Sequence, residues 1–428
     1  MANFHFSWYC DPTTYQHGNV KEFWTDEDSI LKQLEQLKKW QNEEAKKIPD
    51  LIVSSKFTHL NEPVICGTQY GGVIPVMDSR LLLQLVRKQK QMKEYDKEKE
   101  DIMNLRKSMY DMFFNGSGCF VMKNLYDPSL MEQFNSWCNG MISESWENID
   151  KTNDENCTSN ARQNVSDDLN FVHPTQKGKY LINDVLSRLS STNKIMLLYN
   201  LLYDSDGAFL LHWLIDVMLG FGKIGAAAAH WITPNSNSKQ FSHVDFPINI
   251  NSSPFWGMSP DRVRQLTTMT QLNTILPHHS CQVLIACDSM DEINGSTEVI
   301  PCSQKISNLD LAITKESCFY NMLDGMSLFR NVQLDQGDVL IFNRRLIHRG
   351  GANKSGTRRN ALILQYVSLW GVGQEILNVN SILSSLTEYH HHMVSKNEYS
   401  EARTEREQFT DFLLRINPPY PKDTRTGT

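Results

Sequence analysis

Four side chains in two distant parts of this sequence could together perform oxidative chemistry on a metal. His243 and Asp245 lie two residues apart, and His348 follows much further along the chain. Two imidazoles and one carboxylate on one face of a metal leave positions open for substrate and oxygen, and this ligand set is typical of non-heme Fe(II) oxygenases. Arg359 follows His348 and is a permanent cation that can grip a dicarboxylate through two hydrogen bonds.

The two ligand segments have the pattern of β-strands. On a strand, which we expect over residues 243–250, His243 and Asp245 would face the same side. His348 follows an apolar strand expected at 339–342 and precedes a glycine-containing loop, which suits an open metal site. Each residue alone has a commoner structural explanation, so the metal-site hypothesis depends on the combination.

Arg358 and Arg359 are adjacent, and a strand would send them to opposite faces. Only one of them can point into the fold, and we expect this to be Arg359. A buried guanidinium needs a strong partner, which an ordinary salt bridge or a dicarboxylate cosubstrate could supply. The basic residues Arg344, Arg345 and Arg349 lie beside His348. They could attract an acidic substrate, but we favour the simpler explanation that they pair with carboxylates nearby in the structure.

Size and composition exclude several classes of protein. The chain has 428 residues with a net charge of −7, which argues against nucleic-acid binding as its main role. No apolar run is long enough to span a bilayer, and the first residues lack the pattern of a secretory signal. The nine cysteines form no Cys-x-x-Cys pair, so we expect reduced thiols in a cytoplasmic protein. The oligomeric state is not predicted.

The order of the expected elements indicates an α+β protein. Apolar spacing predicts helices at 28–47, 81–114, 128–137, 182–203 and 210–219, and a charged amphipathic helix at 398–415. Short strands are expected at 118–122, 226–232, 281–288, 296–300 and 361–367, and a polar loop at 150–168. Many short strands preceded by helices predict a β-barrel or jelly roll with a helical layer.

Residues 115–370 resemble the phytanoyl-CoA dioxygenase family of Fe(II)- and 2-oxoglutarate-dependent oxygenases. The resemblance is carried by the opening strand at 115–125, by His243 and Asp245, by the hairpin at 283–304, and by the segment from Gly337 and Asp338 to His348 that continues to Asn353, Ser355 and Arg359. Two positions depart from the family pattern. The family often has Pro-Gly-Ser-His where this chain has residues 301–304, Pro-Cys-Ser-Gln, and a hydroxyl residue at the position of Gly350.

The resemblance implies a double-stranded β-helix (jelly roll, cupin-like) with flanking helices and an extra helical N-terminal region. It implies Fe(II) held by His243, Asp245 and His348, with 2-oxoglutarate as cosubstrate bound by Arg359 and with O₂ as oxidant. The expected division is a helical extension at 1–105, the oxygenase domain at 106–375 and a helical tail at 376–428. Related halogenases replace the metal carboxylate with a small residue, so Asp245 implies hydroxylation or desaturation of an unactivated C–H.

Four functional hypotheses follow, and the first is favoured. It is oxidation of a small-molecule substrate, coupled to decarboxylation of 2-oxoglutarate to succinate. The second applies the same chemistry to a protein or nucleic-acid group. The third is a non-catalytic barrel scaffold, which predicts loss of a ligand or of the arginine, and neither is lost. The fourth is a cupin-type metal protein, which would use more histidines and leave Arg359 unexplained.

Overall fold

The computed structural model describes residues 27–368, apart from 58–59, 70, 90–96, 151–171, 177, 193, 221, 241, 246–279, 307–322 and 324–325. Its helices are α1 (Glu27–Ser54), α2 (Ser79–Gln89), α3 (Lys97–Phe114), α4 (Pro128–Asp150), α5 (Val185–Ser191), α6 (Ile195–Leu202) and α7 (Asp206–Leu219). Its strands are β1 (Ile65–Gln69), β2 (Ile74–Asp78), β3 (Cys119–Lys123), β4 (Val172–Gln176), β5 (Lys179–Ile182), β6 (Gly222–Ile232), β7 (Ser280–Ala286), β8 (Thr297–Val299), β9 (Arg330–Asn331), β10 (Val339–Asn343), β11 (His348–Gly350) and β12 (Arg359–Ser368).

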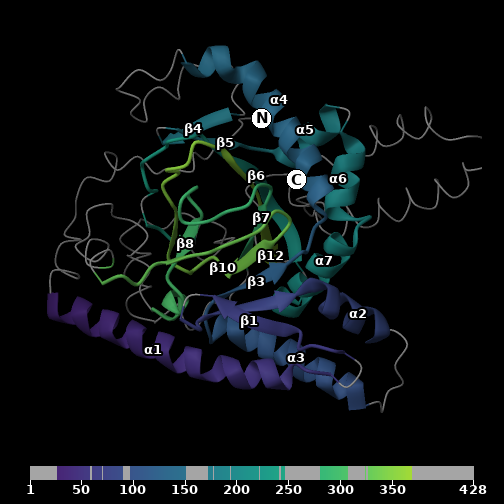
Figure 1. Cartoon of the computed structure of the whole chain (residues 1–428), viewed down its shortest axis with the longest axis vertical. Helices are drawn as coiled ribbons and strands as arrows, with labels where there is room; N and C mark the ends of the chain where they lie inside the picture. Colours follow the sequence, from purple (N-terminus) through teal and green to yellow (C-terminus); the bar gives the residue numbers. More distant parts are fainter. Residues whose placement is uncertain are drawn as a thin grey trace, which may run out of the picture.

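Two facing sheets form the centre of the molecule (Figure 1). Within the described ranges, the larger sheet has the order β1-β2-β3-β10-β7-β12-β6-β5-β4, and the smaller has the order β11-β8-β9. A cluster of buried apolar side chains joins the sheets and includes Val121, Leu284, Val299 and Leu340. This arrangement confirms the predicted double-stranded β-helix with flanking helices.

Alternating side chains on the central strands serve two different cores. On β10, Leu340 and Phe342 point between the two sheets, whereas Val339 and Ile341 point toward the helices. Because successive residues of a strand face opposite sides, an apolar strand such as this one must be covered on both faces. Helices α2 to α7 provide the outer cover, and the smaller sheet provides the inner one.

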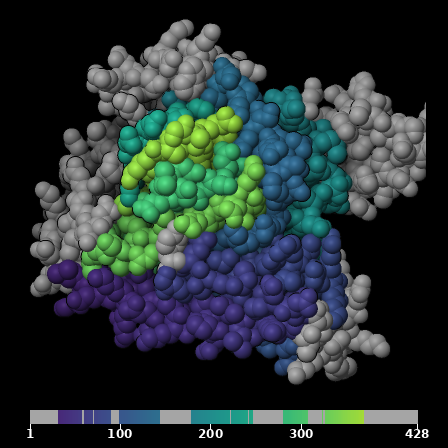
Figure 2. Space-filling view, in the orientation of Figure 1, coloured from purple at the N-terminus to yellow at the C-terminus, as the bar shows by residue number. Residues whose placement is uncertain are grey.

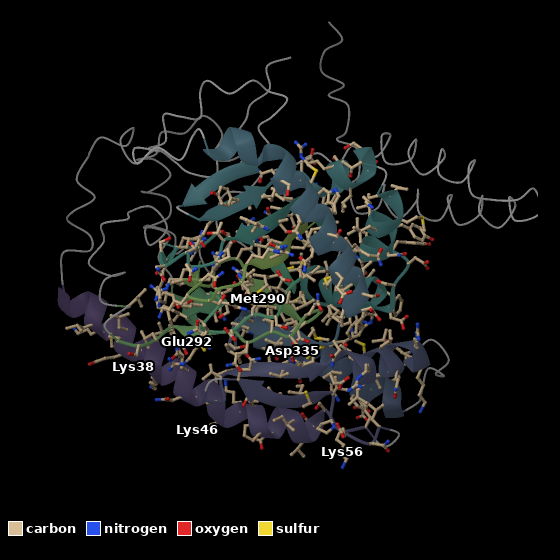
Figure 3. The ribbon with its side chains drawn as sticks, turned by 45° about the horizontal axis from the view of Figure 1, so that its top comes forward. Lys38, Lys46, Lys56, Met290, Glu292 and Asp335 are labelled. Carbon is tan, nitrogen blue, oxygen red and sulfur yellow. The ribbon has the colours of Figure 1, made fainter. Side chains whose placement is uncertain are left out.

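The N-terminal region is part of the same structure. The predicted helix at 28–47 is confirmed and runs further, as α1. Its buried face differs from the one that its apolar spacing indicates, which is Ile30, Leu31, Leu34, Leu37 and Trp40. Leu34, Leu37, Gln41, Glu44 and Ile48 line the buried face, whereas Leu31 is exposed. Figure 2 shows α1 in purple along one edge of the molecule, and the exposed Lys38 and Lys46 project outward from it in Figure 3.

Two strands in the N-terminal region were not predicted. β1 pairs with β2, and β2 then pairs in parallel with β3 of the larger sheet. The boundary expected at residue 105 therefore falls inside α3, whose buried Ile102 and Met109 belong to the same apolar cluster as the sheet. A parallel pairing across intervening helices leaves no local signal in the sequence.

Other expected elements differ in length. The helix expected at 81–114 is divided into α2 and α3, and the one expected at 182–203 is divided into α5 and α6 after the end of β5. The loop expected at 150–168 begins at Asp150, which the structure places as the last residue of α4, and the rest of it lies outside the described residues. The tail at 398–415 and the expected helical tail domain at 376–428 also lie outside them. No helix in the described part of the chain is long and apolar enough to cross a membrane.

Gly337 should be among the least replaceable residues of the fold. Its φ of +87° lies in the left-handed region, and a Cβ there would lie 2.2 Å from the backbone oxygen of Tyr126. We expect Gly337→Ala to lower the free energy of unfolding by about 3 kcal/mol, because strain and collision add. Gly71 is the matched control, since its φ is +70° but nothing lies within 4 Å of its Cβ position. Urea unfolding measures both variants, and equal losses would contradict the role of the collision.

Candidate metal centre

The three candidate ligands come together at one end of the space between the sheets. The Asp245 carboxylate lies between the two imidazoles, with Oδ1 3.7 Å from Nε2 of His243 and Oδ2 3.6 Å from Nε2 of His348. Their ligand atoms all lie within 4.8 Å of one another. Bonds of about 2.1 Å at right angles would place ligand atoms about 3 Å apart, so a metal would require only a small contraction.

The segment that carries His243 and Asp245 lies beside β11. His243 and His348 exchange backbone hydrogen bonds of 3.0 Å in each direction, which forms an isolated antiparallel bridge. The strand expected over 243–250 is thus limited to this bridge among the described residues. Val244 packs on a separate apolar cluster outside the smaller sheet, so its two neighbours face the other side, as the spacing predicts.

A hydrogen bond at one ring nitrogen of His348 leaves the other nitrogen free to bind a metal. Its Nδ1 lies 3.0 Å from the carbonyl oxygen of Leu346, so Nδ1–H can donate there and leave the Nε2 lone pair available. Burial, with the neighbouring His243, lowers the pKa of His348 to about 4, so the ring is neutral near pH 7. Burial opposes ionisation of Asp245, but His348 and Arg344 outweigh it and lower the carboxyl pKa. Neutral imidazoles and an ionised carboxylate are the states that bind metal.

Arg359 is buried in the barrel at the first residue of β12. Its side chain is 2% exposed, whereas Arg358 is exposed, in agreement with the expected alternation. Nη1 donates to the Met290 sulfur at 3.3 Å, and Nε has no hydrogen-bond partner among the described residues. Met290 is labelled in Figure 3, near the centre of the sheets. Burial lowers the pKa of Arg359 to about 10, and the carboxylate of Asp288 opposes this shift.

Two further basic groups, Lys179 and His230, face Arg359; the sequence indicated no role for Lys179, and for His230 it favoured core packing over lining the site. Lys179 on β5 and His230 on β6 both interact electrostatically with Arg359, and His230 also interacts with Asp245. Strand pairing explains this, because Arg359 opposes Ile232 and Lys179 opposes Ile232 from the other side. Burial, with Arg359 nearby, lowers the pKa of Lys179 to about 7 and of His230 to about 3. In the sequence, the only feature that could have indicated Lys179 as a site residue was its place at the start of a short apolar strand.

At both positions where the chain departs from the family pattern, other polar side chains of the chain make contacts. Ser303 Oγ accepts a hydrogen bond of 2.7 Å from Ile347 N, and Gln304 Nε2 donates to the Gly116 carbonyl at 3.0 Å. The hairpin therefore still supports the residue preceding His348. At Gly350, a Cβ would lie 3.2 Å from Gln240 Oε1 and 3.6 Å from Lys179 Nζ. These two polar side chains approach the position where a hydroxyl residue is often found.

The basic residues near His348 contact carboxylates. Arg349 Nε lies 2.6 Å from Glu298 Oε2, and Lys239 Nζ lies 2.8 Å from the other oxygen of Glu298. Arg344 Nε lies 3.9 Å from Asp245 Oδ2. These pairs agree with the structural explanation of the basic residues.

Comparison with known proteins supports this interpretation. Residues 261–361 match the family model described as phytanoyl-CoA dioxygenase. The matched range includes His348 and Arg359 but begins after Asp245. No curated protein sequence matches the chain.

Similar solved structures are distant. The non-heme alpha ketoglutarate dependent epimerase SnoN from nogalamycin biosynthesis is 11% identical with a TM-score of 0.39, over 64% of this chain and 86% of that one. AviO1 from Streptomyces viridochromogenes is 15% identical with a TM-score of 0.36, over 62% and 95%. EctD from S. alaskensis is 12% identical with a TM-score of 0.40, over 61% and 76%. These likenesses are too distant to support a conclusion about this chain.

The match over residues 261–361 gives a likeness to this family, and the two-histidine, one-carboxylate cluster is chemically consistent with it. Fe(II), 2-oxoglutarate and O₂ are the reactants of this class of enzyme. Over residues 261–361 the chain is therefore similar to the phytanoyl-CoA dioxygenase family of Fe(II)- and 2-oxoglutarate-dependent oxygenases.

Proposed function

We propose that this protein oxidises an unactivated C–H bond of a small-molecule substrate, with hydroxylation as the favoured outcome. In the hydroxylation, substrate R–H, 2-oxoglutarate and O₂ give R–OH, succinate and CO₂, so one oxygen atom enters each organic product. The observation that carries the proposal is the convergence of His243, Asp245 and His348 within 4.8 Å. The chemistry of this donor set fits a ferrous ion with positions left open.

The three ligands would hold Fe(II) with one negative charge from the protein. His348 would bind through Nε2, because its Nδ1 faces the Leu346 carbonyl. When bound, the metal with its cosubstrate supplies the oxidising power for C–H cleavage. The protein side chains hold the ligands, bind the cosubstrate and restrict access of water.

Arg359 is the proposed anchor for the far carboxylate of 2-oxoglutarate. Its guanidinium is buried at 2% exposure, and the Nε–H has no acceptor among the described residues. A buried donor without an acceptor costs free energy, and a carboxylate would satisfy it with a charge-assisted bond. Lys179 would add a second positive charge on the same side of the site.

A turnover assay tests the proposed function directly. Purified protein is loaded anaerobically with Fe(II), mixed with 2-oxoglutarate and exposed to O₂, and succinate is measured with and without a chelator. We expect slow succinate formation that requires both Fe(II) and O₂, even without substrate. A screen of small molecules then seeks one that increases succinate and gains oxygen, with peptides and oligonucleotides as comparison sets. Absence of metal binding and of succinate would contradict the proposal.

The environment of the thiols is consistent with a reducing compartment. The cysteines in the described residues are all free: Cys66, Cys119, Cys138, Cys281, Cys287 and Cys302. Ferrous iron is also most easily retained where reductants are abundant. We therefore propose a cytoplasmic location, together with substrates that are available there.

Cosubstrate capture should weaken as pH rises through the titration of Lys179. With its pKa lowered to about 7, this amine is charged below that pH and neutral above it. Because the charged form attracts the 2-oxoglutarate dianion, we expect kcat/KM for 2-oxoglutarate to fall about tenfold between about pH 6 and about pH 8. In Lys179→Met, kcat/KM for 2-oxoglutarate should stay at the low value that the wild type reaches above about pH 8, at every pH tested. An unchanged pH profile in this variant would exclude Lys179 as the group responsible.

A further inference from the structure

Arg344 follows the last residue of β10 and lies beside the candidate carboxylate ligand Asp245. Its side chain is 1% exposed, and its Nε lies 3.9 Å from Asp245 Oδ2. The contact is doubled through the backbone, because the Asp245 N–H donates to the Arg344 carbonyl at 3.0 Å. One residue thus contacts both the main chain and the side chain of Asp245.

The turn that carries Arg344 is itself fixed by several hydrogen bonds around Asn343. Asn343 N donates to the Gly118 carbonyl at 2.8 Å, which ties the turn to the start of β3. The side-chain oxygen of Asn343 accepts from Arg345 N at 3.0 Å, and its carbonyl accepts from Leu346 N at 2.8 Å. Arg344 therefore projects from a well-defined position toward Asp245.

We propose that Arg344 is a positioning residue that orients the Asp245 carboxylate for metal binding. This inference rests on the proposed function, since it assigns a role within the same metal site. Arg344 would attract Oδ2 and leave Oδ1, which is nearer His243, directed toward the metal. A carboxylate held at one oxygen before the metal arrives loses less conformational freedom on binding, and partners of metal ligands commonly strengthen binding in this way.

Two alternative roles of Arg344 give different expectations. If the guanidinium acts only as a nearby positive charge, it repels the metal dication, and its removal should tighten metal binding. If it instead binds an acidic group of the substrate, its removal should leave metal affinity unchanged and affect substrate alone. Only the positioning role predicts weaker metal binding in its absence.

The test measures metal affinity separately from cosubstrate affinity. Mn(II) alone is titrated into the full-length protein, and free Mn(II) is followed by electron paramagnetic resonance. The KM for 2-oxoglutarate is then measured at saturating Fe(II). For Arg344→Met we expect the Mn(II) dissociation constant to rise about 10- to 100-fold, with KM for 2-oxoglutarate unchanged. Arg344→Lys should recover part of the metal affinity, because it restores the positive charge.

Two controls define the result. Arg345→Met removes the adjacent guanidinium of the same turn and should leave the Mn(II) dissociation constant unchanged. Arg359→Met should give the opposite pattern, with normal Mn(II) binding and a raised KM for 2-oxoglutarate. Thermal unfolding shows whether each variant is folded, and the lysine variant serves if Arg344→Met does not fold.

The outcomes separate this inference from the proposed function. Mn(II) binding by Arg344→Met that is equal to or tighter than that of the wild type would overturn the positioning role while the oxygenase assignment stands. A wild-type protein that neither binds Mn(II) nor forms succinate would contradict the proposed function itself.

Discussion

Asp245→Asn should reduce succinate formation by at least about 100-fold while leaving the protein folded. The amide has nearly the same shape as the carboxylate, but it removes the negative charge that would bind the metal. Asp245 lies among His243, His348 and Arg344, so its replacement leaves three basic groups without the anion they surround. Mn(II) affinity should fall together with turnover. The measurements are succinate yield and Mn(II) titration on the same preparation.

An exposed carboxylate provides the control for this substitution. Asp204 lies between α6 and α7 on the surface, and Asp204→Asn should retain wild-type turnover and metal affinity. Thermal unfolding of Asp245→Asn distinguishes lost metal binding from lost folding. Full turnover with undiminished Mn(II) affinity in Asp245→Asn would remove this residue from the ligand set and require a different site.

Arg359→Met should raise the KM for 2-oxoglutarate by roughly 100-fold, equivalent to about 3 kcal/mol of charge-assisted hydrogen bonding. Methionine retains much of the side-chain volume among buried neighbours such as Met290, but it offers no donor to a carboxylate. Metal affinity should not change, because Arg359 does not contact the three candidate ligands. Steady-state kinetics with varied 2-oxoglutarate at saturating Fe(II) provides the measurement.

The adjacent arginine is the matched control for Arg359. Arg358 is exposed and should tolerate Arg358→Met without a change in KM. Arg359→Lys should fall between wild type and Arg359→Met, since it restores the charge without the planar pair of donors. A raised KM in Arg358→Met and a normal one in Arg359→Met would reverse the assignment of the two arginines.

Local sequence patterns predicted the helices and strands correctly where those elements depend on residues close together in the chain. The spacing of Leu34 and Leu37 predicted a helix, and the apolar run at 339–342 predicted a strand, because periodicity follows directly from helix and strand geometry. The alternation of Arg358 and Arg359 predicted that only one of the two side chains would be buried, and the structure shows that it is Arg359.

Polar residues on apolar faces were harder to predict. Gln41 and Glu44 continue the buried face of α1, although their types indicate exposure. The structure explains Gln41, whose Nε2 donates to the Pro301 carbonyl at 3.0 Å across a separation of 260 residues. A polar group is buried only where it finds a hydrogen-bond partner. When that partner lies so far away in the chain, the residues around Gln41 do not reveal it.

The sequence by itself determined the residue types of the candidate site, which are two histidines, one aspartate and one arginine on segments with the pattern of strands. It also determined the class of fold, because strand and helix periods are local properties. Only the tertiary structure decided that His243 and His348 form a bridge, that Lys179 and His230 approach Arg359, and that Arg344 contacts Asp245. These contacts join residues far apart in the chain, and pairing between distant strands determines them rather than any spacing along the sequence.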